Sequence, residues 1–250
     1  MPRHHMRLSL VPPLLGVLIC LTVNTPADAQ YRRHPHSGVL RPARGFAGGN
    51  FTLGQGLGMF GDSVGAAYGG EGHLLLKLDR LGIIGLRTEA GFLTYAHERK
   101  RVPWGGTVGG RVNLNLTTSN DLLYATAGPQ LMMPTGGVRP YVAAMAGISN
   151  FWTESGLEGT GSDEQFASST NYRDAWKVAY SGAVGMYVPL KGGPRPTSLD
   201  VGVHYLRNGQ RNWLKPGRIQ DNPDNTITVF PISSVANVLT YRVGVTVGIF

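Results

Sequence analysis

Cysteine is nearly absent from this sequence, with one residue, Cys20, in 250. It lies in the N-terminal segment and follows Ile19, where a lipid-modified cysteine would require a small residue. The rest of the chain therefore excludes disulfide-stapled folds and thiol chemistry. Beyond the N-terminal segment there is also no apolar run long enough for a transmembrane helix, so any membrane crossing there must use β-strands.

Charged residues are also scarce, at 15% of the chain, and acidic residues are outnumbered by Lys and Arg, 15 to 23. The formal net charge of +8 raises nucleic acid or an anionic membrane surface as partners. The basic residues are scattered and form no continuous basic helix, which favours the membrane and predicts no nucleic-acid partner. Glycine, in contrast, is abundant at 36 residues, as suits strands packed around a narrow interior.

The first 29 residues have the features of a cleaved signal peptide. Arg3 and Arg7 precede a mostly apolar stretch over residues 8–23, and the sequence Ala27-Asp28-Ala29 matches an A-x-A cleavage site. A membrane-anchor helix is the alternative, but the apolar stretch is short and broken by two prolines. We therefore expect an exported protein whose residues 30–45 form a disordered linker. His34 and His36 in that linker are expected to bind no metal specifically.

Two-residue alternation dominates the remaining chain, residues 46–250. From Leu239 to Ile249 every odd position is apolar and every even position is polar or small, which predicts a β-strand with two different faces. Similar segments occupy residues 46–57, 66–78, 84–95, 108–116, 122–133, 139–152, 176–190 and 198–206. Joining 108–116 and 122–133 into one long strand gives eight strands, whereas keeping them separate would imply ten with one missed.

Alternation alone does not say which face points inward, so a secreted soluble barrel or sandwich stays an alternative. Several features favour a closed barrel with its apolar face outward: the glycine content, the export signal, the terminal aromatic residue Phe250 and the loop lengths. Polar loops are expected at residues 97–106, 153–175 and 207–228, and short turns between the other strands. Phe250 falls on the polar register of its strand, which predicts a frayed end or a bulge near Gly248.

The sequence P-T-G-G-V-R-P-Y-V-A-A-M-A-G-I at 134–148, Y-S-G-A-V-G-M-Y-V-P-L at 180–190, and the closing strand resemble the small outer-membrane β-barrel superfamily of OmpA- and OmpX-like domains. The resemblance covers residues 46–250. It implies an all-β, closed, antiparallel up-and-down transmembrane barrel of eight strands, with both termini in the periplasm and the long loops outside. It also implies a monomer in outer-membrane lipid, assembled by the barrel-assembly machinery through its C-terminal strand.

An eight-stranded barrel has an interior wide enough only for side chains, so charges on the polar face should pair inside it. The ten residues expected in this lumen network are Glu71, His73, Lys77, Arg87, Glu89, Arg111, Lys177, Asp200, His204 and Arg242. Because both signs are present, we interpret the network as a structural plug. A gated pore or proton path in a narrow, porin-like channel is the alternative.

Two clusters of basic residues fall in expected outer loops: Arg99, Lys100 and Arg101, and then Arg207, Arg211, Lys215 and Arg218. They could contact the phosphates of lipopolysaccharide, or simply form soluble loop surface. The four tryptophans, Trp104, Trp152, Trp176 and Trp213, fit an interfacial aromatic girdle, although loop packing is also open for Trp213.

A lipid A-modifying enzyme is the main rival from another class. One such deacylase family carries a His-x-Ser-Asn pattern, and the run V-H-Y-L-R-N-G at 203–209 is superficially similar. Aligned on Asn208, however, Tyr205 takes the His place and Arg207 the Ser place, so nucleophile and base are both missing. We expect no catalytic residue, metal or cofactor, and a structural or surface-interaction role. The pair Asp200 and His204 is interpreted as part of the network, and His97 beside Glu98 is only a weak protease signal.

Overall fold

The computed structural model describes residues 43–103, 113–159, 165–215, 217–222 and 227–249. The chain divides into two units, residues 1–39 and 40–250, and only the second contains described residues. The predicted signal peptide and nearly all of the predicted linker thus lie outside the described part. Among the described residues, no helix is long and apolar enough to cross a membrane.

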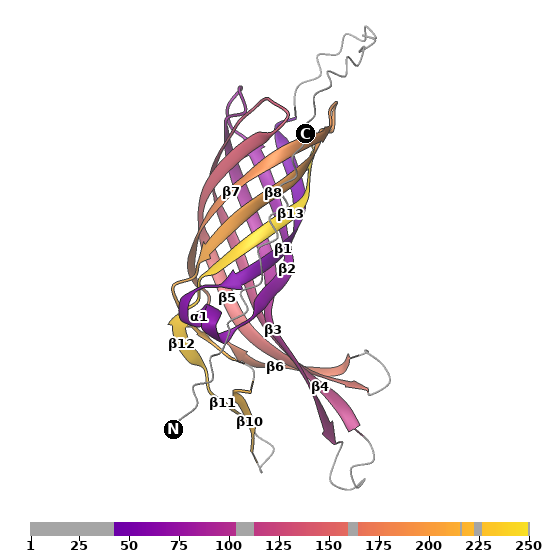
Figure 1. Ribbon diagram of the computed structural model, residues 1–250, viewed down its shortest axis with the longest axis vertical. Helices are drawn as coiled ribbons and strands as arrows, with labels where there is room; N and C mark the ends of the chain where they lie inside the picture. The colour runs from indigo at the N-terminus through magenta and orange to yellow at the C-terminus, as the bar shows by residue number, and fades with distance from the viewer. Residues whose placement is uncertain (1–42, 104–112, 160–164, 216, 223–226, 250) are drawn as a thin grey trace, which may run out of the picture. The chain divides into compact units, whose positions relative to one another are not determined.

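Eight antiparallel strands close into a ring in the order β1-β2-β3-β4-β5-β7-β8-β13, and β13 pairs again with β1 (Figure 1). The predicted all-β barrel of eight strands is confirmed, and the alternative of ten is wrong because β4 runs unbroken where two strands were considered. The ring strands are β1 (Gly45–Gly56), β2 (Ala66–Lys77), β3 (Ile84–Pro103), β4 (Asn113–Met132), β5 (Arg139–Gly159), β7 (Lys177–Lys191), β8 (Thr197–Arg207) and β13 (Val238–Gly248).

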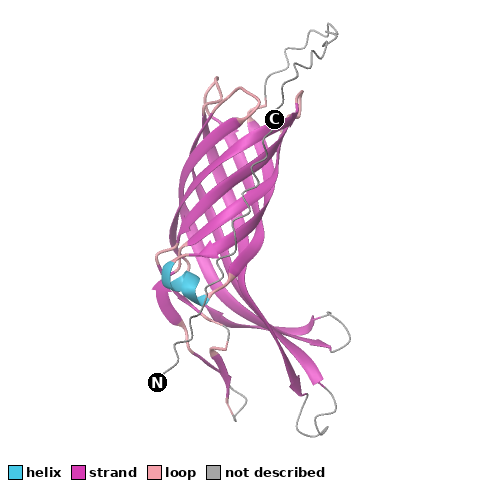
Figure 2. Cartoon of the chain, in the orientation of Figure 1, coloured by secondary structure: helices cyan, strands magenta, loops and turns pink. Residues whose placement is uncertain are grey.

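The two ends of the barrel differ. At one end, here the turn end, residues 78–83, 133–138 and 192–196 connect neighbouring strands by short turns. The opposite end, here the loop end, carries longer connections with structure of their own (Figure 2). Its additional elements are the helix α1 (Gly58–Ser63) and the short strands β6 (Gln165–Arg173), β9 (Gln210–Trp213), β10 (Ile219–Asp221), β11 (Ile227–Val229) and β12 (Ile232–Val235).

The first of the short turns is fixed by an aspartate. The backbone N–H groups of Ile83 and Ile84 donate to the Asp79 carboxylate, at 3.1 and 2.9 Å. Although desolvation by itself would raise the pKa of this carboxyl, these backbone hydrogen bonds hold the pKa below its ordinary value. The turn is therefore strongest with Asp79 ionised.

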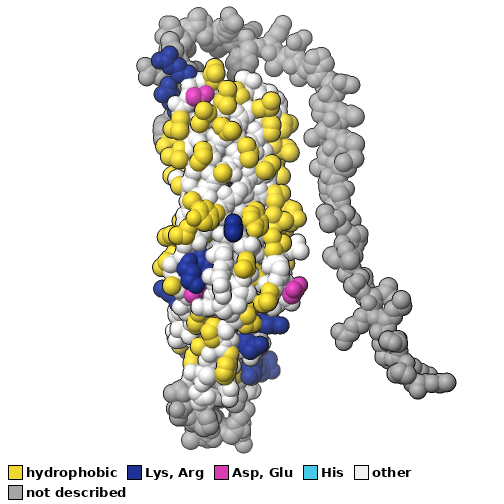
Figure 3. All heavy atoms as spheres, turned by 90° about the vertical axis from the view of Figure 1, so that its left-hand side faces the viewer, with side chains coloured by type: hydrophobic (Ala, Val, Ile, Leu, Met, Phe, Trp, Pro, Cys, Tyr) yellow, Lys and Arg dark blue, Asp and Glu magenta, His cyan; other side chains and the backbone are white. Residues whose placement is uncertain are grey.

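Apolar side chains cover the outside of the barrel. In β13, Tyr241, Val243 and Val245 are exposed, whereas Thr240, Arg242 and Thr246 are buried inside, as the odd–even pattern predicts. Figure 3 shows the resulting surface, where hydrophobic side chains cover the barrel wall and Lys and Arg gather mainly toward its ends. An apolar surface of this extent would be a liability in water, but it matches a bilayer, and strands of 11 or 12 residues are long enough to cross one. The fold is that of a transmembrane β-barrel.

Three ring strands continue past the barrel wall at the loop end. Pairing of β2 with β3 ends at Thr94, but β3 and β4 stay paired to Pro103 and Asn113. On the far side, β6 takes over pairing with β5 where β7 leaves it. The result is a four-stranded protruding sheet made of residues 96–103, 113–120, 152–159 and β6, visible at the lower right of Figure 1. The predicted loops over 97–106 and 153–175 were therefore wrong in most of their described residues.

A bulge in β3 marks the start of this protruding sheet. The register with β4 shifts between Thr94 and Ala96, which leaves Tyr95 as the extra residue. Before the bulge, odd-numbered residues such as Arg87 and Glu89 face the lumen. Beyond it, even-numbered residues take the inner side, because one inserted residue reverses the alternation.

The closing strand matches the predicted alternating segment to within one residue at each end. β13 begins at Val238. Residues 232–235 form a separate strand, β12, which pairs with β9 at the loop end. The predicted loop 207–228 likewise contains β9 and β10. Phe250, for which a frayed end or a bulge was expected, lies outside the described residues.

Candidate functional site

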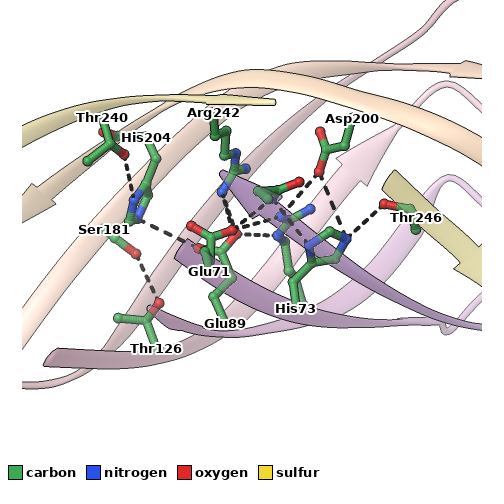
Figure 4. A network of polar contacts seen from close by, with 12 residues as sticks. Glu71, His73, Glu89, Thr126, Ser181, Asp200, His204, Thr240, Arg242 and Thr246 are labelled. Carbon is green, nitrogen blue, oxygen red and sulfur yellow. Dashed lines mark hydrogen bonds and ion pairs between the residues drawn. The ribbon is translucent and has the colours of Figure 1, made fainter. Parts of the chain in front are cut away.

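Four charged side chains from three strands meet in the middle of the lumen. The Arg242 guanidinium donates from Nη1 to Glu71 Oε1 at 3.0 Å and to Glu89 Oε1 at 2.7 Å. Arg87 donates from Nε to the same Glu89 oxygen, and its Nη2 lies 3.5 Å from Glu71 Oε1. All four side chains are fully buried. Figure 4 shows Glu71, Glu89 and Arg242 pointing toward one another. They meet because the strand register places β2, β3 and β13 on one side of a narrow barrel with their polar faces inward.

Tyrosine hydroxyls and amides surround this core and form hydrogen bonds with several of its remaining atoms. Tyr124 donates to Glu71 Oε2 at 2.9 Å, and Tyr141 donates to Asp200 Oδ1 at 2.7 Å. Arg87 Nη1 donates to the Tyr187 hydroxyl at 2.7 Å. Such bonds are needed because an ion pair in a dry interior is stable only when its other polar atoms are also paired. Asn50 and Gln130 add two more amides, to Glu71 and Arg87 respectively.

The two buried histidines lie beside different carboxylates. His204 Nε2 lies 3.7 Å from Glu89 Oε2, while His73 Nε2 lies 3.9 Å from Asp200 Oδ2. Thus Asp200 accompanies His73, and the Asp200–His204 pair considered from the sequence is not formed. His73 Nε2 also lies 2.9 Å from the Thr246 hydroxyl (Figure 4).

The charges in this network nearly balance. Glu71, Glu89 and Asp200 supply three carboxylates, and Arg87 and Arg242 supply two guanidinium groups. With both histidines neutral the formal sum is −1, which is small for so many buried ionisable groups. A balanced set of this kind stabilises the interior without favouring ions of one sign.

One subset of the network has metal-like spacing. Ligand atoms of Glu71, Glu89 and His204 lie within 4.8 Å of one another. The two carboxylates already accept hydrogen bonds from Arg242, so a metal ion would have to displace a guanidinium from between them. The donor set therefore fits the arginine that is present better than it fits a metal ion.

Apolar clusters close the lumen on both sides of the network. At the loop end, Phe60 of α1 packs edge-on against Tyr95, Phe151 and Trp213, with ring centroids 5.2, 6.0 and 4.9 Å away. At the turn end, the rings of Tyr141 and Tyr187 stack at 4.7 Å beside Leu75 and Met132. We call the first group the aromatic plug. Because side chains fill the lumen on both sides, the network is cut off from water.

Two residues that the sequence suggested for the outer surface are instead buried at the loop end: Trp213 in the aromatic plug, and Arg211 beside Phe151 of that plug. Trp213 is fully buried and donates from Nε1 to Ser234 at 2.9 Å, so it belongs to loop packing and not to an interfacial girdle. Arg211 is also fully buried and donates from Nη2 to Ser149 Oγ at 2.6 Å. Burial lowers the pKa of the Arg211 guanidinium, against the raising influence of Asp174. The expectation that Arg211 contacts lipopolysaccharide is therefore wrong.

Two of the other residues expected in the lumen network, Lys177 and Lys77, lie away from it. Lys177 is partly exposed at the loop end and pairs with Asp174 at 3.4 Å, because its strand begins there and not in mid-barrel. Lys77 is half-buried at the turn end, with its ammonium 4.6 Å from the centre of the Phe46 ring. Arg111 lies outside the described residues. Seven of the ten expected residues thus meet in the network: Glu71, His73, Arg87, Glu89, Asp200, His204 and Arg242.

The remaining basic residues fall into two groups. Arg99 lies on the protruding sheet and pairs with Glu158 at 2.8 Å. The side chains of Lys100, Arg101, Arg207, Lys215 and Arg218 are exposed at the loop end.

The two positions compared with the His and Ser of a deacylase lie on the outside of β8, where Tyr205 and Arg207 point away from the lumen.

Sequence reasoning missed the tyrosines of the network, although a signal for one of them was present. Tyr187 has the opposite parity to the outward residues Val184 and Met186, so alternation alone places it inward. Tyr124 and Tyr141 could be placed in the same way from the strands that contain them. What alternation cannot show is which carboxylate each hydroxyl reaches.

No family model and no curated protein matches this sequence. Among solved structures, the chain is similar to Neisserial surface protein A, at 12% identity and a TM-score of 0.44, over 82% of this chain and 97% of that one. It is also similar to OprG from Pseudomonas aeruginosa, at 12% identity and 0.42, over 83% and 96%. A third is Ail, the attachment invasion locus protein of Yersinia pestis, at 10% identity and 0.41, over 82% and 98%.

Proposed function

We propose that this protein is a non-enzymatic barrel of the bacterial outer membrane, with a structural or surface-interaction role. The lumen does not conduct, and the loop end with its protruding sheet faces the outside of the cell. The observation that carries this proposal is the buried charge network held between two apolar clusters. A channel needs a continuous wet path, and here side chains occupy that path.

The placement in the outer membrane follows from the shape and surface of the barrel. Single-chain barrels of that membrane combine an even strand number, an apolar outer band, short turns on the periplasmic side and long loops outside. The described ring strands are even in number, carry an apolar outer face, and are joined by short turns at one end and longer connections at the other. The closing strand β13 would then be the segment offered to the barrel-assembly machinery.

Three measurements test this proposal: the cellular location, the conductance and the mass of lipid A. Cell fractionation should recover the full-length protein in the outer-membrane fraction and release it only with detergent. A soluble periplasmic pool would overturn the location. In planar lipid bilayers the purified protein should produce no steady single-channel steps, and such steps would instead support the narrow-channel alternative. Expression should leave the mass of lipid A unchanged, because a mass shift would indicate a lipid-modifying enzyme.

Lipopolysaccharide contact is a second, narrower part of the proposal, and it now concerns Arg207. This side chain is exposed on the outer face of β8, directly across from Tyr180 of β7, which is also exposed. An aromatic residue beside a cation at the loop-side border of an apolar surface fits the level of lipid head groups. Replacing Arg207 with Ser should reduce lipopolysaccharide co-purification. The matched change Arg195→Ser at the turn end should leave it unchanged.

A further inference from the structure

A cleft of about 180 Å³ lies at the loop end, between the protruding sheet and the loop that carries β10 and β11. Strands β4, β5 and β6 supply one wall, including Thr118, Ser155 and Asn171. The other wall contains Leu214, Lys215, Gly217, Ile219 and Ile227. The lumen network and the aromatic plug do not use this space.

The sheet wall of the cleft is an ordered array of uncharged polar groups. The hydroxyls of Thr118 and Ser155 lie 2.8 Å apart, and Asn171 donates from Nδ2 to Ser155 Oγ at 2.5 Å. One row nearer the barrel, Thr153 donates to Asn120 Oδ1 at 2.6 Å. Hydroxyl and amide groups both donate and accept, so this wall can bind ligand hydroxyls in either sense. Because its side chains already hold one another in place, little order is lost on binding.

Two lysines flank the array from opposite walls. Lys100 comes from β3, where the Tyr95 bulge turns even-numbered residues to the inner side, and Lys215 comes from the loop. Glu98 is the single carboxylate that lines the cleft among the described residues. The local charge is therefore positive, which favours a ligand with one anionic group.

The geometry points to a sugar unit that bears a carboxylate or a phosphate as the ligand of this cleft. Its hydroxyls would meet the polar sheet wall, its anionic group would lie between the two lysines, and its C–H face would cover the aliphatic loop wall. The volume is below that of pockets for drug-sized ligands and suits one ring. No aromatic side chain lines the described cleft, which argues against a nucleobase.

This inference deepens the surface-interaction role proposed above, and the two can fail separately. Sugar binding is measured on purified protein in detergent micelles, whereas the cellular location is measured by fractionation. Acidic sugars could come from the core of the cell's own lipopolysaccharide or from an external glycan.

The test is saturation-transfer NMR with glucuronic acid and glucose 6-phosphate as probes, and glucose and inorganic phosphate as references. We expect both acidic sugars to bind with a Kd of about 1 mM, at least fivefold tighter than either reference. The double variant Lys100→Ser/Lys215→Ser should lose at least fivefold in affinity for the acidic sugars. The matched control Lys191→Ser/Arg195→Ser removes two exposed cations at the turn end and should change nothing.

A second variant separates the polar wall from the charges. Ser155→Ala/Asn171→Ala should weaken glucose and the acidic sugars by the same factor, since the hydroxyl contacts are shared. Equal binding of glucose and glucose 6-phosphate would overturn the inference, and so would phosphate alone binding as tightly, or a lysine variant that matches the control. Competition with deacylated lipopolysaccharide or with oligogalacturonate then shows which source supplies the ligand, and displacement by neither would also overturn it.

Discussion

Replacing Arg242 with methionine removes the cation that joins both glutamates of the lumen network. Three hydrogen bonds disappear, to Glu71 at 3.0 Å, to Glu89 at 2.7 Å and to the Tyr141 hydroxyl at 3.0 Å. Methionine keeps an unbranched chain, so the cavity term is small and the loss is mainly electrostatic. Removing one partner of a buried ion pair costs about 3–5 kcal/mol, because the other charge stays buried and unpaired. We expect the free energy of unfolding to fall by that amount.

The same charge count predicts a partial rescue. Glu71→Gln alone leaves two carboxylates facing two guanidinium groups, so it should change stability little. In the Arg242→Met background, Glu71→Gln removes one of the carboxylates left unpaired and should recover at least 1 kcal/mol, within the usual range of coupling between neighbours. The neutral amide at position 71 can still accept a hydrogen bond from Tyr124, and burying such an amide costs far less free energy than burying an unpaired carboxylate.

Urea unfolding in lipid vesicles, followed by tryptophan fluorescence, measures these differences. With slopes of roughly 1–3 kcal/mol per molar urea, Arg242→Met should lower the midpoint by about 1 M or more. Arg218→Met on the exposed loop is the control and should stay within about 0.5 kcal/mol of the parent. A loss below about 1 kcal/mol for Arg242→Met, or no gain from adding Glu71→Gln, would refute the view that the network is a paired plug.

Three further predictions concern other parts of the barrel. Trp213→Ala empties the centre of the aromatic plug and should cost about 3–5 kcal/mol in the same urea assay; a loss under 1 kcal/mol would mean that the loops repack freely. Gly91→Val should block folding into vesicles, because a Cβ there would overlap the Tyr124 ring, while Gly72→Val, whose Cβ would meet only a backbone oxygen at 3.9 Å, should fold. Asp79 has a depressed pKa in the folded turn, so its contribution is present above the ordinary value of 3.8 and is lost as the pH falls through the lower folded value. NMR titration should show that depressed pKa in the parent, and Asp79→Asn should remove the corresponding acid-side loss of turn stability.

Strand-level features could be read from the sequence because they depend on local chemistry. Alternation placed Glu71 and Arg87 inside and Tyr241 and Val243 outside, and the structure agrees at each position. Side chains in a strand point to opposite faces with a period of two, so no knowledge of neighbours is needed. The requirement for an even strand number was also enough to join the two halves of β4.

The protruding sheet was missed because its sequence has loop-like composition. Residues 97–101 are basic and polar, and residues 165–173 include a run of small polar side chains at Ser168, Ser169, Thr170 and Asn171. They form strands because each continues, or pairs with, a strand already fixed by the barrel, so tertiary pairing overrides the local preference. The Tyr95 bulge, which turns Lys100 toward the cleft, has no signature in the sequence.

The sequence by itself determined that each strand has one apolar face and one polar or charged face, because this depends only on the period of two and on the residue types along the strand. It favoured a closed barrel with the apolar face outward and left a soluble barrel or sandwich as an alternative. Only the tertiary structure decided which charges meet. Asp200 lies beside His73 and not His204, Lys177 pairs with Asp174 outside the network, and Arg211 is buried beneath the loops. Those contacts depend on the stagger between strands and on how the loops fold over the mouth. Both are set by the closure of the whole ring, which no single segment encodes.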